Sequence, residues 1–205
     1  MENRYLAVEI DEQTGAIRSI RDKHRDVEHR QAGIGFALTT DRADIRSGSV
    51  SRVEGATESL TLYFQEKDFE IRLHYRLGSQ DRFVEKWLEI DAKDTNGYVL
   101  RDVVLEDVAL DPQFREIHVH DDQTKWHCPI NLFLRGDTGG CFAGLAYPYW
   151  KLDLRGDSGF RLGFTPNFTV GDGETFVSER YFLGVYGYEG IYRYSHGPFP
   201  GALPP

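Results

Sequence analysis

The 205-residue sequence has few of several residue types, and each scarcity excludes a class of protein. Two cysteines are too few for a small fold that disulfides hold together. No apolar run approaches the ~20 residues that a membrane-spanning helix needs, so we expect no membrane partner. Lysine and arginine number 24 against 33 acidic residues, and the net charge of -9 repels phosphate, which disfavours nucleic acid as a partner.

Short segments in which apolar and polar residues alternate are, by contrast, abundant. The alternation is cleanest in 69–77, where every second residue is apolar, and it predicts an antiparallel strand with one buried face. Residues 82–92 also fit helical spacing, but we prefer a strand with Val84, Leu88 and Ile90 on one face and Glu85, Trp87 and Glu89 on the other. Residues 22–30 are too charged to bury and are not among the expected strands. The remaining expected strands are 5–10, 16–20, 34–38, 50–53, 59–64, 98–110, 116–120, 175–185 and 191–194.

These strands predict an all-β fold, a large sandwich in which two antiparallel sheets pack face to face. We expect one sandwich domain over residues 1–196. Residues 197–205 are rich in proline and glycine, which is linker composition, and we expect them to lead to a further C-terminal domain. No apolar leader segment follows Met1, and the sequence gives no indication of the compartment.

Two predicted hairpin tips have nearly the same sequence, Leu-Arg-Gly-Asp-Thr-Gly at 134–139 and Leu-Arg-Gly-Asp-Ser-Gly at 154–159. Glycine and aspartate are the residues that tight turns require, so we interpret both Arg-Gly-Asp triplets as turn chemistry and not as adhesion motifs. Cys128 and Cys141 flank the first hairpin. Two buried thiols are the preferred interpretation of this pair, and a disulfide across the hairpin is the alternative.

Three stretches together carry a resemblance to a known family. They are 6–20, which reads as the opening hairpin; 75–97, which runs from Tyr-Arg-Leu through Val-Glu-Lys-Trp-Leu-Glu-Ile to Asn-Gly; and 171–179, Gly-Asp-Gly-Glu-Thr-Phe-Val-Ser-Glu. They resemble the galactose-mutarotase-like supersandwich, in particular the version that precedes the catalytic barrel in α-galactosidase-like glycoside hydrolases. The resemblance implies a sandwich that packs against the barrel and in some cases lends residues to the sugar pocket, while the catalytic carboxylates lie in the barrel.

The densest group of functional side chains lies between residues 118 and 127. On a strand, His118 and His120 point to the same side, a spacing that can supply two ligands to one metal ion. No spacing fixes a third ligand, so we predict no metal site and interpret the two as histidines on a polar sheet face. Asp121, Asp122 and Trp126 follow them and complete this part of the candidate ligand-binding group.

Sugar binding requires an aromatic surface on which C–H faces stack, and carboxylate or amide groups that meet the hydroxyls. The candidate aromatic residues are Trp126, Tyr149 and Trp150, beside the histidines and aspartates of 118–122. We expect them on loops at one end of the sandwich, where binding groups commonly lie. The alternative is that these aromatic residues belong to the core.

The preferred hypothesis is an accessory domain of a glycoside-hydrolase-like protein, which binds carbohydrate or frames the substrate, without a complete catalytic site or a cofactor of its own. Its expected partners are a carbohydrate and a C-terminal catalytic barrel in the full-length chain. The first alternative is a free-standing aldose epimerase, which would use His118 or His120 as the acid and Glu179 as the base. The second is a purely structural domain that buries one face against a neighbouring domain.

Overall fold

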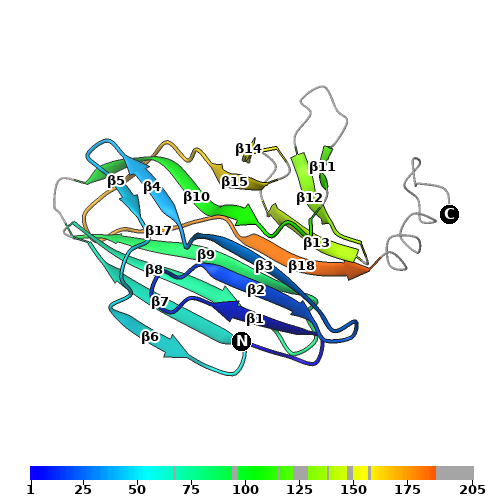
Figure 1. Cartoon of the computed structure of the whole chain (residues 1–205). Helices are drawn as coiled ribbons and strands as arrows, with labels where there is room; N and C mark the ends of the chain where they lie inside the picture. Colours follow the sequence, from blue (N-terminus) through cyan, green and yellow to red (C-terminus); the bar gives the residue numbers. More distant parts are fainter. Residues whose placement is uncertain are drawn as a thin grey trace.

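The computed structural model describes residues 1–66, 68–93, 97–114, 116–121, 129–137, 139–146, 150–156 and 158–187, with the backbone alone for residues 120, 121, 129 and 130. All the regular elements in these ranges are β-strands, and they form two antiparallel sheets (Figure 1). The prediction of an all-β sandwich is therefore confirmed. Among the described residues, no helix is long and apolar enough to cross a membrane.

The first sheet is built around β10 (Tyr98–Leu110), a 13-residue strand that pairs with four others. Its main path is β1 (Leu6–Ile10), β2 (Ile17–Asp22), β3 (Val27–Ile34), β10, β15 (Gly159–Phe164) and β14 (Lys151–Leu154). In addition, β4 (Ala37–Thr40) and β16 (Phe168–Val170) pair with β10, and β5 (Asp44–Arg46) pairs with β4.

The second sheet is wider along its main path and is the one that concerns function. Its order is β11 (Glu116–Asp121), β12 (Pro129–Arg135), β13 (Gly139–Leu145), β18 (Tyr181–Gly187), β9 (Phe83–Ala92), β8 (Phe69–Arg76), β7 (Ser59–Gln65) and β6 (Arg52–Gly55). The short strand β17 (Thr175–Val177) pairs with β9. In Figure 1, β11 and β12 rise steeply from the direction of β9 and β18, which shows how strongly this sheet twists.

The core lies between the two sheets and is filled by the inward side chains of the alternating strands. Burial along β8 and β9 changes at every residue, with Leu73 and Leu88 fully buried and their chain neighbours partly exposed. This period of two is the one that the sequence predicts for both segments. At about 25 cal/mol for each Å² of apolar area removed from water, the packed inner faces supply the main driving force for folding.

An ion pair is enclosed in this core. Lys86 of β9 lies on the same inward face as Val84 and Leu88, and its ammonium donates to Glu106 of β10 at 3.0 Å. Both side chains are 0% exposed. Gln31 donates to the other Glu106 oxygen at 3.2 Å, so both carboxylate oxygens of Glu106 have a hydrogen-bond donor. The pair connects the two sheets at the middle of the sandwich.

Both predicted hairpins form. They are β12–β13 and β14–β15, and Gly139 and Gly156 take positive φ angles of 148° and 58° at their turns. Cys141 of β13 is a free, buried thiol, and burial raises its pKa. The register places Leu134 opposite Cys141. Cys128 lies outside the described residues.

Four details differ from the sequence prediction. The strand expected at 34–38 does not form as one element, because β3 ends at Ile34 and β4 begins at Ala37. Residues 27–34 form β3, because a strand with one solvent face tolerates charged residues there while His29 packs against Phe114 on the other. The expected strand at 175–185 is divided into β17 and β18, and the strand expected at 50–53 begins two residues later, at Arg52. The strand predicted at 191–194 and the linker at 197–205 lie outside the described residues.

Candidate functional site

The outer face of the second sheet, the side turned away from the core, gathers aromatic and charged side chains from neighbouring strands. We use this name for the outward side chains of β7, β8, β9, β17, β18, β13, β12 and β11. Strand register fixes which of them are neighbours: His74 lies opposite Trp87, and Phe182 lies opposite Glu85. Because the alternate residues of the same strands are buried in the core, these side chains point to the outer face of the sheet.

A charged network covers the β8 and β9 part of this face. The Arg72 guanidinium lies between two carboxylates, at 3.1 Å from Glu89 and 2.9 Å from Asp91. The Thr175 hydroxyl of β17 donates to Asp91 at 2.6 Å. His74 lies 3.5 Å from Glu89; burial lowers the pKa of His74, and the negative charge of Glu89 partly opposes this shift. The network holds its members in fixed positions, and the carboxylates of Glu89 and Asp91 balance the positive charge of Arg72.

Trp87 lies beside this network, and its ring is in contact with two other side chains, His74 and Arg180. His74 stacks on it at a centroid distance of 5.0 Å and an angle of 13°, and the Arg180 guanidinium lies 4.7 Å from the ring. Arg180 also forms an ion pair of 2.9 Å with Glu85, to which Arg76 makes a longer contact of 3.4 Å. Two guanidinium groups therefore share one carboxylate next to an indole ring.

A stripe of half-buried aromatic rings continues from this point across β18, β13 and β12. The Phe182 ring lies 6.3 Å from Phe83 on one side and 6.3 Å from Phe142 on the other. Phe133 faces Phe142 across β12 and β13 and contacts Tyr186 at 5.7 Å. We call these five residues the aromatic stripe. It gives the outer face a partly exposed apolar centre with charged side chains at the β9 side.

Of the two predicted histidines, His118 lies on the same face as the aromatic stripe, at its far end. His118 of β11 is exposed and lies opposite Phe133 in the register, and His120 lies opposite Asn131. From β11 to β9 there are four strand spacings, or about 19 Å at about 4.8 Å per spacing. In the second sheet, the aromatic stripe therefore lies between β11, which carries the predicted histidines, and the Trp87 and Glu85 side chains of β9.

Among the other predicted site residues that the structure describes, Trp150 is not brought to this face. Trp150 is 5% exposed and belongs to the core, so the expectation that it forms an exposed binding surface is wrong; the alternative of a core tryptophan applies to it. Glu179 is half-buried on the short connection between β17 and β18. Asp121 ends β11. Asp122, Trp126 and Tyr149 lie outside the described residues.

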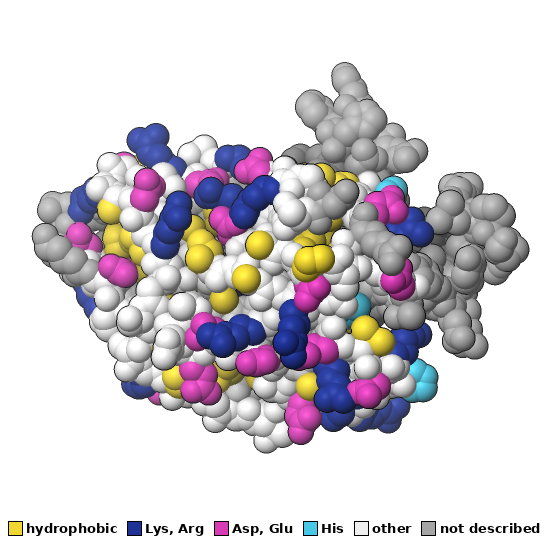
Figure 2. Space-filling view, in the orientation of Figure 1, with side chains coloured by type: hydrophobic (Ala, Val, Ile, Leu, Met, Phe, Trp, Pro, Cys, Tyr) yellow, Lys and Arg dark blue, Asp and Glu magenta, His cyan; other side chains and the backbone are white. Residues whose placement is uncertain are grey.

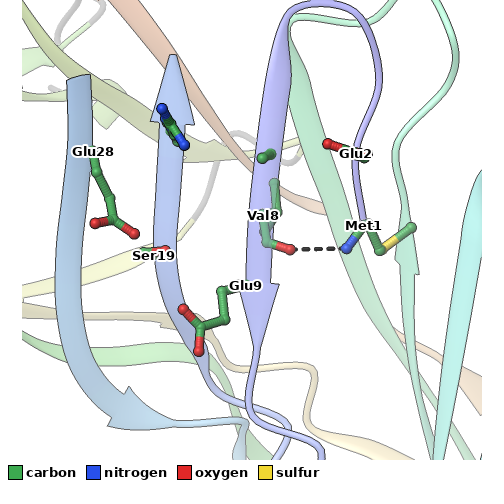
Figure 3. A pocket seen from close by; sticks show the side chains of 8 residues that line it. Met1, Glu2, Val8, Glu9, Ser19 and Glu28 are labelled. Carbon is green, nitrogen blue, oxygen red and sulfur yellow. Dashed lines mark hydrogen bonds between the residues drawn. The ribbon is translucent and has the colours of Figure 1, made fainter. Parts of the chain in front are cut away.

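Hollows elsewhere on the surface are less suited to a sugar. A depression of about 360 Å³ lies over β1, β2 and β3, and its lining includes Met1, Glu9, Ser19 and Glu28 (Figure 3). The Met1 ammonium donates a hydrogen bond of 2.9 Å to the Val8 carbonyl. None of its lining residues is aromatic, and hydrogen bonds from Ser19 and Arg30 lower the pKa of Glu28. The first sheet therefore offers polar groups there without a surface for stacking.

A second hollow, of about 420 Å³, extends the outer face toward its edge at β6. Tyr63 lies in it, with the Arg52 guanidinium 3.7 Å from its ring and Gln65 and Glu70 beside it. Glu54 accepts a hydrogen bond of 2.7 Å from the Tyr63 hydroxyl. The hollow lies on the neighbouring strands β6, β7 and β8, so it belongs to the same face as the aromatic stripe.

The charge of the molecule does not by itself single out a site. Figure 2 shows lysine and arginine side chains beside aspartate and glutamate over the face in view, with small hydrophobic areas between them. In the part of the chain that the structure describes, no group of three His, Cys, Asp or Glu side chains is placed to hold a metal ion.

Sequence reasoning missed the role of Trp87, Arg180 and the aromatic stripe. The alternation of 82–92 places Trp87 and Glu85 on the polar face of β9, and that was the available signal. Phe142, Phe182 and Arg180 gave no such signal, because their positions beside β9 depend on the pairing of β18 with β9 and β13.

Comparison with known proteins gives the fold its name. No protein-family model and no curated protein matches the sequence. A polysaccharide lyase superposes with a TM-score of 0.62 at 11% identity, over 91% of this chain and 33% of the lyase. The galactose mutarotase related enzyme of Lactobacillus acidophilus superposes with a TM-score of 0.59 at 12% identity, over 91% of this chain and 96% of that protein. The fold is a galactose-mutarotase-like sandwich.

A glycoside hydrolase has the same sandwich as part of a longer chain. A variant of the GH36 α-galactosidase AgaA from Geobacillus stearothermophilus, in complex with raffinose, superposes with a TM-score of 0.55 at 8% identity. The match covers 93% of this chain and 41% of the α-galactosidase. The resemblance stated from the sequence is thus confirmed at the level of the fold, and this chain spans less than half of the lyase and of the hydrolase.

Proposed function

We propose that the galactose-mutarotase-like sandwich binds carbohydrate on the outer face of its second sheet, as an accessory domain that holds or frames a sugar. The observation that carries this proposal is the aromatic stripe, a row of partly exposed rings at the middle of a sheet whose opposite face packs in the core. Aromatic rings left partly in water are costly unless a ligand covers them, and the apolar C–H face of a sugar is a ligand that does so. The charged network beside the stripe supplies donors and acceptors for hydroxyl groups.

The similar proteins support a carbohydrate ligand without identifying it. Their names refer to a polysaccharide lyase, a galactose mutarotase related enzyme and an α-galactosidase in complex with raffinose. In the lyase and the hydrolase the sandwich is 33% and 41% of the chain, and this favours an accessory role beside a separate catalytic unit. A C-terminal catalytic barrel is accordingly the partner that we propose for the full-length protein.

The test is a binding measurement with two phenylalanine variants. Phe182→Ala removes the central ring of the stripe, and Phe168→Ala removes a ring that is 50% exposed on β16 of the first sheet. Isothermal titration with a panel of mono- and oligosaccharides should show binding that Phe182→Ala weakens about tenfold and Phe168→Ala leaves unchanged. Equal loss in both variants, with both still folded by circular dichroism, would place the sugar elsewhere.

The rival is a free-standing aldose epimerase, and one observation favours it. This chain covers 96% of the galactose mutarotase related enzyme, so a sandwich of this size exists as a separate protein. Epimerisation needs an acid and a base on opposite sides of the sugar. His118, exposed at one end of the aromatic stripe, is the acid that the described residues offer for this role. Polarimetry of freshly dissolved galactose decides between the two functions.

A further inference from the structure

The centre of the outer face holds an imbalance of charge. Arg76 and Arg180 both form ion pairs with Glu85, and both pairs use the same oxygen, Oε2, at 3.4 Å and 2.9 Å. Among the described residues, no carboxylate other than that of Glu85 lies within ion-pair distance of the Arg76 or Arg180 guanidinium. Two positive charges are thus matched by one negative charge. The arginine side chains are 50% and 47% exposed, so their remaining N–H donors are open to solvent.

Other arginines on the outer face do not share this imbalance. Arg72 lies between the carboxylates of Glu89 and Asp91, and Arg135 of β12 forms an ion pair of 2.8 Å with Glu116. The whole chain is acidic, with a net charge of -9, so an uncompensated guanidinium at the middle of a sheet face is not a product of composition. The imbalance is local to the β8–β9–β18 part of the outer face.

Trp87 and Glu85 hold the Arg180 guanidinium in place. The Trp87 ring lies 4.7 Å from the Arg180 guanidinium, and an arginine stacked on an aromatic ring keeps its fork of donors in a defined plane. Phe182 lies opposite Glu85 in the register, so this central ring of the aromatic stripe adjoins the ion pairs that Glu85 forms with the two arginines. A planar anion in contact with both guanidinium groups would lie at the edge of the stacking surface.

We propose that the ligand of the outer face is an acidic sugar, a hexuronate or a glycan that contains one. Its carboxylate binds between Arg76 and Arg180, and its ring stacks on Phe182. A carboxylate is the group that matches a pair of arginine forks in both charge and planar shape, whereas a neutral hydroxymethyl group at the same carbon leaves the excess charge unmatched. This inference rests on the proposed function and specifies its substrate class.

The experiment compares sugars that differ only at C6. Galactose with galacturonic acid, and glucose with glucuronic acid, are titrated into the whole protein by calorimetry at low and high salt. The acid of at least one pair should bind more than tenfold tighter than its neutral partner, and salt should weaken the acid alone. Arg180→Gln and Arg76→Gln should each remove most of that preference, and Arg180→Lys should restore part of it. Arg135→Gln, which alters an arginine that forms an ion pair with Glu116 on the same face, is the matched control and should keep the preference.

Each result decides a different point. Neutral and acidic sugars that bind equally, with Phe182→Ala weakening both, would overturn the acidic ligand and leave the carbohydrate function standing. An acid preference that survives both Arg→Gln changes would place the carboxylate at another site and would also overturn the inference. If no sugar of either kind binds to the folded wild-type protein, the proposed function fails together with its extension. Circular dichroism of every variant separates loss of binding from loss of fold.

Discussion

Removal of one partner of the buried ion pair should be among the most damaging single changes to this fold. Lys86→Met leaves the Glu106 carboxylate inside the core with the Gln31 amide as its nearest donor, and Glu106→Gln leaves the Lys86 ammonium without a counter-charge. A buried charge that loses its partner costs about 3–5 kcal/mol. With a urea m value of about 2 kcal/mol per M for a domain of this size, a loss of about 4 kcal/mol lowers the unfolding midpoint by about 2 M.

The two single variants should respond to pH in opposite directions. Burial raises the pKa of Glu106 and lowers the pKa of Lys86, and in wild type the partner's charge opposes each shift. In Lys86→Met the folded-state pKa of Glu106 lies above the unfolded value of about 4.3, so stability falls as pH rises through the interval between them. In Glu106→Gln the folded-state pKa of Lys86 lies below the unfolded value of about 10.4, so stability rises with pH up to that value. Each slope is at most about 1.4 kcal/mol per pH unit.

Urea titrations at pH 5, 7 and 9 measure both effects. The double variant Lys86→Met with Glu106→Leu removes both charges, and it should be as stable as wild type or more stable by about 1–4 kcal/mol. The matched control is Arg18→Met at the exposed ion pair of 2.7 Å with Asp11, which should leave the midpoint almost unchanged. Single core variants that behave like this control, or pH slopes of the same sign in both, would refute the argument that the pair is sealed from water.

The remaining predictions concern other described residues. Tyr181→Phe should keep or raise the melting temperature, because the buried Tyr181 hydroxyl has no hydrogen-bond partner among the described residues. Tyr75→Phe should lower the free energy of unfolding by about 1 kcal/mol, because it removes the 2.5 Å hydrogen bond to the Gly15 carbonyl. Equal shifts of the melting temperature in the two variants would contradict this. Trp150→Ala should cost about 3–5 kcal/mol in urea unfolding, since its side chain is core, and a stable variant with weaker sugar binding would reverse that assignment. In a polarimeter the domain should not speed galactose mutarotation above buffer, and an acceleration that His118→Ala or His120→Ala abolishes would instead establish the epimerase.

The sequence alone determined the fold class and much of the strand pattern. In β8 and β9, alternation is a local property, because successive side chains of a strand point to opposite faces whatever the strand pairs with. It therefore predicted the buried faces of both strands, and turn residues predicted the hairpins at Gly139 and Gly156. Lys86 occupies an inward position in the same alternation, and the pattern alone gave no reason to expect a lysine to be buried there.

The candidate site could be predicted only in part. The least reliable prediction from the sequence was which individual side chains are exposed. His118 of β11 is exposed on a sheet face, as the sequence pattern indicates. Trp150 was expected at the same surface, yet it fills the core, because burial of a large aromatic ring depends on what the opposite sheet places above it. Residues 27–34 became a strand for a related reason, since β2 and β10 supply backbone partners on both sides.

Only the tertiary structure decided where the site lies. The late strand β18 is inserted between β13 and β9, and this pairing alone brings Phe182 and Arg180 beside Trp87 and Glu85. Alternation states which face a side chain takes, but it does not state which strand lies next to it. Strand order is fixed by contacts between segments far apart in the chain, and those contacts form only when both sheets close over one shared core.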